Sequence, residues 1–70
     1  MSVAPDIHIT PREKEILLWL AEGKTKFETA IILGITEDTV NTHTTNVRAK
    51  LDAVNSIQLI AKALRTGIIT

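Results

Sequence analysis

Apolar residues recur at helical spacing in four segments of the chain, and each segment opens on a residue typical of a helix N-terminus. The predicted N-cap residues are Thr10, Thr25, Thr36 and Asn55. The predicted helices span about residues 11–22, 26–33, 37–51 and 56–66. Alternation of apolar and polar residues at strand spacing is nowhere sustained. The pattern therefore predicts an all-α domain of four helices.

The second and third predicted helices are joined by a very short connection that contains Gly34. So short a turn prevents antiparallel packing, and a helix-turn-helix crossing at roughly 90–120° is the common solution. Ala30 and Val40 supply the small residue and the aliphatic anchor that such a crossing needs. Because these residue types occur in many all-α domains, their spacing alone does not distinguish a helix-turn-helix from another small helical fold.

The predicted helix 37–51 has one apolar stripe and one face rich in short polar side chains. At 100° per residue, the apolar stripe contains Val40, Thr44, Val47 and Leu51. The opposite face presents Thr42 and Thr45, and Asn41 flanks it. A solvated helix face usually carries Glu and Lys, whereas Asn and Thr are mediocre helix formers that can read base edges in a major groove. This face is therefore interpreted as a DNA-reading surface.

Composition excludes several classes of protein and complicates the DNA interpretation. The 70 residues make one small domain, whose eight basic and eight acidic side chains give a net charge of zero, which argues against nucleic acid. Without cysteine, a signal peptide or a long apolar run, the chain is expected to be cytoplasmic, with no membrane association. The chain has two histidines, His8 and His43, and no metal site is expected. It has no group of residues that resembles a catalytic triad or dyad and no phosphate-binding loop, so no cofactor and no enzymatic activity are expected.

Several short motifs, taken together, resemble one known family. They are Thr10-Pro11-Arg12-Glu13, Ala21-Glu22-Gly23-Lys24-Thr25, Gly34-Ile35-Thr36, Thr39-Val40, His43, Asn46-Val47 and Lys50-Leu51. In this combination the chain resembles, over about residues 8–69, the LuxR-type (FixJ/GerE-like) DNA-binding domain of bacterial transcription regulators. It looks most like the quorum-sensing branch that responds to acyl-homoserine lactones.

The resemblance implies a helix-turn-helix whose third helix enters the major groove. Base contacts are implied at Asn41, Thr42 and Thr45. Contacts to the DNA backbone are expected from Lys24, Thr25, Lys26, Phe27, Arg48 and Lys50. Relatives often have Lys or Arg at positions 41, 42 or 45, so we expect weak binding by a monomer, strengthened by a dimer on two half-sites.

The fourth predicted helix is expected to supply the contact of a homodimer. Ile57, Ile60, Ala61 and Leu64 form a stripe assigned to the core. Leu59, Ala63 and Thr66 form a narrower stripe assigned to the dimer interface. A single broad surface facing the core is an equally good interpretation. Double-stranded DNA, a second copy of the chain and RNA polymerase are thus the expected partners.

Residues 1–9 are expected to form an arm or linker stub before the DNA-binding domain at 10–70, which favours a fragment of a longer protein. The neutral charge is unevenly spread: residues 1–40 carry four basic and seven acidic side chains, whereas residues 41–70 carry four basic and one acidic. Weak, salt-sensitive DNA binding is therefore compatible with a net charge of zero.

Two alternative functions remain. One is a helical protein-interaction module that does not bind DNA. The other is a domain like region 4 of a sigma factor, but the capped fourth helix argues against that one.

Overall fold

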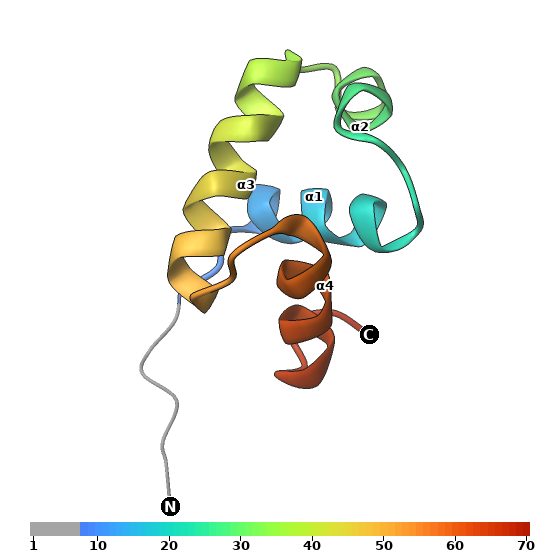
Figure 1. Cartoon of the computed structure of the whole chain (residues 1–70). Coiled ribbons are helices and arrows are strands. Elements are labelled where there is room, and N and C mark those ends of the chain that lie inside the picture. The colour runs from blue at the N-terminus through green and yellow to red at the C-terminus, as the bar shows by residue number, and fades with distance from the viewer. Residues whose placement is uncertain (1–7) are drawn as a thin grey trace, which may run out of the picture.

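The computed structural model describes residues 8–70, which fold into four helices without a strand (Figure 1). The helices are α1 (Pro11–Ala21), α2 (Lys26–Leu33), α3 (Glu37–Leu51) and α4 (Ser56–Arg65). The all-α prediction is confirmed, and every predicted helix end lies within one residue of the observed one. The expected arm at 1–9 falls almost entirely outside the described residues.

Side-chain caps begin each helix where the sequence predicts. Thr10 forms a capping box in which its hydroxyl accepts the Glu13 N–H and the Glu13 carboxylate accepts the Thr10 N–H. Thr25 and Glu28 repeat this arrangement at the start of α2. Each cap satisfies backbone N–H groups that have no partner inside the helix, which explains why the starts could be predicted from local sequence.

The helices α1 and α3 each pack against all three of the other helices. In Figure 1, α3 runs along one side of the molecule, with α2 across its N-terminal end and α4 against its C-terminal half. The short turn through Gly34, whose φ of 69° places it in the left-handed region, separates α2 from α3. The two helices thus form the predicted helix-turn-helix.

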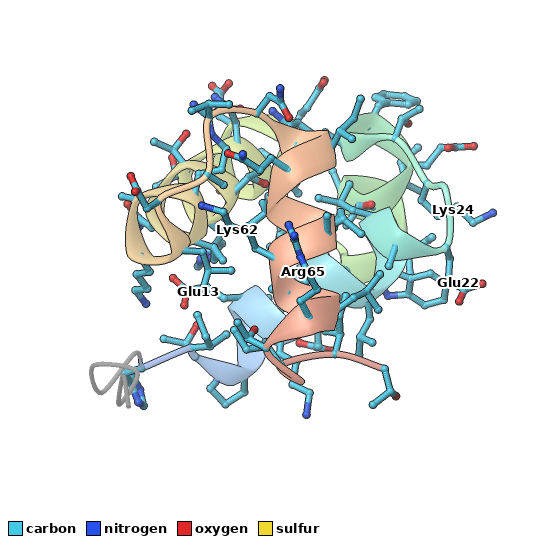
Figure 2. The ribbon with its side chains drawn as sticks, turned by 60° about the horizontal axis from the view of Figure 1, so that its bottom comes forward. Glu13, Glu22, Lys24, Lys62 and Arg65 are labelled. Atoms are coloured by element: carbon cyan, nitrogen blue, oxygen red, sulfur yellow. The ribbon has the colours of Figure 1, made fainter. Side chains whose placement is uncertain are left out.

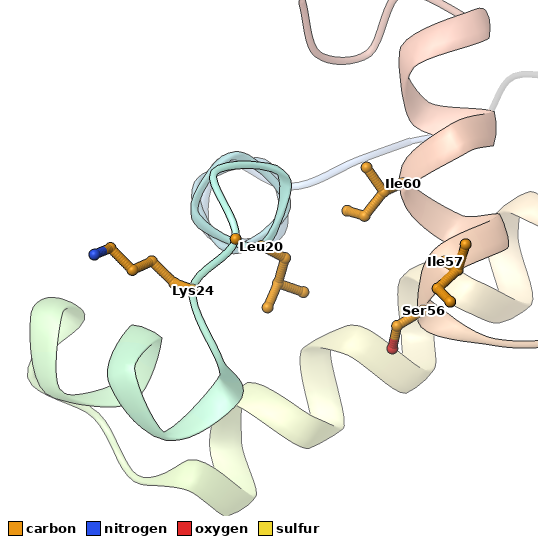
Figure 3. Close-up of a pocket in the computed structure, with 6 residues that line it drawn as sticks. Leu20, Lys24, Ser56, Ile57 and Ile60 are labelled. Atoms are coloured by element: carbon orange, nitrogen blue, oxygen red, sulfur yellow. The ribbon is translucent and has the colours of Figure 1, made fainter.

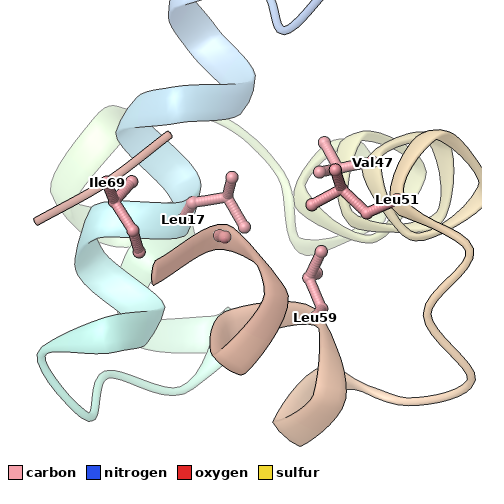
Figure 4. Packing of buried hydrophobic residues seen from close by; sticks show 6 residues of the cluster. Leu17, Val47, Leu51, Leu59 and Ile69 are labelled. Atoms are coloured by element: carbon pink, nitrogen blue, oxygen red, sulfur yellow. The ribbon is translucent and has the colours of Figure 1, made fainter. Parts of the chain in front are cut away.

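Two clusters of buried side chains hold the helices together. One cluster joins α1 to the helix-turn-helix through Ile16, Ala30 and Val40. The other joins α1, α3, α4 and the C-terminal segment, and it consists of Leu17, Val47, Leu51, Leu59, Ala63 and Ile69 (Figure 4). The predicted apolar stripe of α3 is confirmed, since Val40 and Val47 are almost completely buried.

Two threonines are buried in this interior with their hydroxyls satisfied. The hydroxyl of Thr29 donates to the backbone oxygen of Thr25 at 2.8 Å, and that of Thr44 donates to the oxygen of Val40 at 2.7 Å. A buried hydroxyl without a partner would be costly, whereas these bonds inside the helix remove that cost. Thr29 and Thr44 therefore fit the core.

Within residues 8–70, no helix combines the length and the apolar character needed to cross a membrane.

Candidate nucleic-acid interface

The face of α3 that points away from the core is exposed along its length. Asn41, Thr42 and Thr45 lie on it, together with Asp38 and Ala49. The hydroxyl of Thr42 donates to the backbone oxygen of Asp38 at 3.0 Å, so its lone pairs and methyl group remain available. Within residues 8–70, Thr45 makes no hydrogen bond through its side chain. The face therefore offers the short polar groups that the sequence predicts, in a position where a partner can reach them.

The first residue of α2 contacts this face directly. The Nζ of Lys26 donates to Oδ1 of Asn41 at 2.8 Å, which joins the two helices of the helix-turn-helix through polar side chains. The two residues were predicted separately, Lys26 for the DNA backbone and Asn41 for a base. The structure brings them together, a contact between positions 15 residues apart that helical spacing cannot reveal.

Exposed groups surround the N-terminus of α2. Figure 2 shows Lys24 extending away from the body of the domain. Thr25 and Phe27 are also exposed, Phe27 by 59%. The Thr25 hydroxyl accepts the N–H of Glu28 and still has its own proton to donate. A helix N-terminus attracts anions through its N–H groups and dipole, but here the carboxylate of Glu28 already accepts the N–H of Thr25. A phosphate contact by these residues stays a prediction.

The two basic residues near the end of α3 are less free than the sequence predicts. Arg48 is half-buried, and its Nε is buried without a hydrogen-bond partner in the described part of the chain. The Nζ of Lys50 donates to Oε1 of Glu13 and to the backbone oxygen of His8, both at 2.7 Å. Two of the three protons of this ammonium group are thus directed toward protein atoms. A DNA contact by Lys50 stays a prediction.

The predicted facing of α4 is wrong for four residues, although Ile60 packs against the buried cluster as predicted. Leu59 and Ala63 were assigned to a dimer interface, but both are completely buried, and Figure 4 shows Leu59 beside Val47 and Leu51. Ile57 and Leu64 were assigned to the core, but their side chains are 84% and 47% exposed. Contact with α3 and with the C-terminal segment selects the Leu59 stripe for the interior. Of the three predicted interface residues, only Thr66 lies at the surface.

The exposed apolar surface of α4 continues onto the end of α1. A shallow hollow separates the two helices, and Ile57 lies at its edge (Figure 3). The hollow is lined by Leu20, Gly23, Lys24, Ser56, Ile57 and Ile60. Asn41, Thr42 and Thr45 do not line this hollow, but Lys24, which is expected to contact the DNA backbone, does.

Comparison with protein families identifies the class of domain. Residues 8–63 match the model of the family described as bacterial regulatory proteins, luxR family. This match covers most of the chain, including the helix-turn-helix and the greater part of α4.

Individual relatives agree with the family match. The regulatory protein SdiA of Escherichia coli is 48% identical over 67 residues, which are 96% of this chain and 28% of SdiA. The quorum sensing-dependent transcriptional regulator RpaR of Rhodopseudomonas palustris is 52% identical over 61 residues, 87% of this chain and 25% of RpaR. This chain therefore spans about a quarter of the length of these relatives.

Solved structures show the same fold. A crystal structure of SdiA superposes with a TM-score of 0.87 at 47% identity, over 97% of this chain and 29% of that one. A complex of VqmA from Vibrio cholerae with a ligand and DNA gives a TM-score of 0.82 at 34% identity, over 96% and 29% of the two chains. A structure of the VqmA dimer without its target DNA gives a TM-score of 0.85 at 35% identity, over 94% of this chain and 29% of that one.

The four helices form a domain of the class found in bacterial regulatory proteins, with α2 and α3 as its helix-turn-helix. The chain belongs to the LuxR family of bacterial regulatory proteins.

Proposed function

We propose that this domain binds double-stranded DNA sequence-specifically by placing α3 in the major groove. The observation that supports this best is the exposure of Asn41, Thr42 and Thr45 on α3, outside the buried stripe of Val40 and Val47. Amide and hydroxyl groups can discriminate between base edges, and the major groove is wide enough for a helix. Recognition by three uncharged side chains gives sequence discrimination with little electrostatic attraction.

Contacts to phosphate would position this helix on the duplex. We assign them to Lys24, Thr25, Lys26 and Phe27 around the start of α2, and to Arg48 on α3. Phosphate contacts fix the register of a protein on DNA without reading its sequence. Lys50 contributes less, because Glu13 and His8 already accept two of its protons.

A second copy of the domain would strengthen this weak binding. We propose that two domains associate through the exposed face of α4, with Ile57 and Leu64 at the contact; Thr66 follows the helix on the side of the buried Leu59 and is not assigned to it. The dimeric VqmA is a relative with this fold. Two domains on half-sites one helical turn apart would double the phosphate contacts without requiring a basic domain.

We further propose that the whole protein acts on DNA in the cytoplasm and does not catalyse a reaction. RNA polymerase is a further partner that we propose for it.

Binding at two salt concentrations tests the proposed function. Fluorescence anisotropy would measure the affinity of the 70-residue chain for random duplex DNA. Three cations at the phosphates, Lys24, Lys26 and Arg48, predict a loss of about 40-fold between roughly 50 mM and 200 mM salt. Undetectable binding at the lower salt concentration would instead favour a protein-interaction module, for which the neutral charge and the exposed Asp38 are the supporting features.

A further inference from the structure

The hydrogen bond between Lys26 and Asn41 determines which end of the Asn41 amide is free. The Nζ of Lys26 lies 2.8 Å from Oδ1 of Asn41, and an ammonium group has donors only. The carbonyl oxygen of the amide must therefore face Lys26. The two N–H groups of Nδ2 remain available to a partner of Asn41 that accepts hydrogen bonds.

This orientation conflicts with the usual pairing of asparagine and adenine. That pairing needs Oδ1 to accept a proton from adenine N6 while Nδ2 donates to N7. The carbonyl oxygen has a second lone pair, but an adenine amino group using it would lie beside the ammonium of Lys26, one donor against another. The positive charge makes this approach unfavourable.

Guanine has the complementary edge. Its N7 and O6 are both acceptors in the major groove, so the two N–H groups of Asn41 can donate to them. The nearby ammonium also favours the partial negative charge of O6 over the amino group that adenine presents at the same place. Lys26 keeps further protons that can bind a phosphate, so the contact with Asn41 is compatible with a backbone contact.

We propose that Lys26 is a positioning residue that makes Asn41 select guanine over adenine. The inference rests on the proposed function, because it assumes that α3 lies in the major groove. Asparagine most often pairs with adenine in the major groove, so the residue type alone favours adenine at Asn41. The bond to Lys26 reverses that choice.

Selection of binding sites from a pool of random duplexes tests the proposal. The wild-type chain identifies the preferred site, and Asn41→Ala identifies the base pair at which preference is lost. At that base pair we expect the wild type to favour guanine over adenine by about tenfold. Lys26→Met should remove most of this preference, whereas Lys26→Arg, which keeps a cation with donors only, should retain it.

Lys24→Met is the matched control for charge. It removes a nearby exposed lysine that makes no hydrogen bond to Asn41, so it should weaken binding to all duplexes equally and keep the preference for guanine. Thermal unfolding followed by circular dichroism would verify that all variants fold.

The outcomes that contradict the proposal are distinct. Three results would each overturn the role of Lys26 while leaving DNA binding intact. The wild type could prefer adenine at this base pair, Lys26→Met could keep the wild-type preference for guanine, or Asn41→Ala could leave the base preference unaltered. Failure of the wild type to enrich any sequence would overturn the proposed function as well.

Discussion

The Nζ of Lys50, in the last turn of α3, donates to Oε1 of Glu13, in the first turn of α1, at 2.7 Å. The same carboxylate oxygen accepts the backbone N–H of Thr10 at 2.9 Å. Glu13 therefore completes the cap of α1 and also joins α1 to the end of α3. Since the side chain of Glu13 is only 4% exposed, its charge depends on these partners.

Removal of the Glu13 carboxylate should destabilise the whole domain. Glu13→Ala leaves the ammonium of Lys50 and the N–H of Thr10 without this acceptor, and the expected loss in the free energy of unfolding is about 1–3 kcal/mol. In so small a domain this is a large part of the total stability. Urea unfolding followed by circular dichroism would measure the loss.

Glu28→Ala is the control for the local cap. Glu28 has the same position in the capping box of α2 and accepts the Thr25 N–H at 2.9 Å, but it is exposed and pairs with no lysine through a hydrogen bond. The Glu28→Ala substitution should therefore lower the free energy of unfolding less than Glu13→Ala does. Equal losses would show that the bond from Lys50 to Glu13 contributes nothing measurable beyond the cap.

The same ion pair predicts a dependence of stability on pH. Burial by itself would raise the pKa of Glu13, but the hydrogen bonds from Lys50 and Thr10 and the charge of Lys50 together lower it from its ordinary value of 4.5. Because the pKa is lower in the folded state, the unfolded state binds more protons as the pH falls. The contribution of Glu13 is thus complete above its ordinary pKa and is lost as the pH decreases through the folded value.

Thermal unfolding at a series of pH values between neutrality and about pH 3 tests this sign. The difference in stability between wild type and Glu13→Gln should be largest near neutral pH and should shrink in acid. The hydrogen bonds of Thr25 also lower the pKa of Glu28, and this contribution is present in both proteins and cancels in the comparison. A difference that stays constant across the series would contradict the assignment.

Local sequence predicts most of this fold because local interactions decide most of it. The four helix starts follow from side-chain caps within three residues of one another, and the exposed face of α3 follows from helical geometry. The facing of α4 could not be predicted in this way, because that helix has two apolar stripes. Packing against Val47 and Leu51, and against Ile69 after the helix, decides between them.

The contacts that refine the candidate site are also non-local. Lys26 meets Asn41 across 15 positions, and Lys50 meets Glu13 across 37. The sequence predicts DNA contacts for Lys26, Asn41 and Lys50 individually, and Glu13 belongs to the Thr10-Pro11-Arg12-Glu13 motif. Their pairing depends on the crossing of α2 with α3 and of α1 with α3, which no periodicity specifies.

Thr45→Ala should reduce sequence discrimination with little effect on folding. The Thr45 side chain is exposed and makes no hydrogen bond to any described residue, so its removal should change stability by less than about 0.5 kcal/mol. If its hydroxyl or methyl group contacts a base, the ratio of specific to random DNA affinity should fall about fivefold. Anisotropy titrations with both duplexes measure this ratio, and equal weakening on the two would argue against a base contact.

The observed facing of α4 predicts opposite consequences for two neighbouring apolar residues. Leu59 is completely buried, so Leu59→Ala should lower the free energy of unfolding by about 2–5 kcal/mol and lower the melting temperature strongly.

Ile57 is 84% exposed, so Ile57→Asp should leave the isolated domain folded, with a stability change within about 1 kcal/mol. On a duplex with two half-sites, the same variant should lose cooperative binding, because a charge in an apolar contact between copies cannot be solvated. Its affinity for a single half-site should be unchanged, which separates association from DNA recognition. Retention of cooperativity by both Ile57→Asp and Leu64→Asp would place the contact between copies elsewhere than on this face of α4.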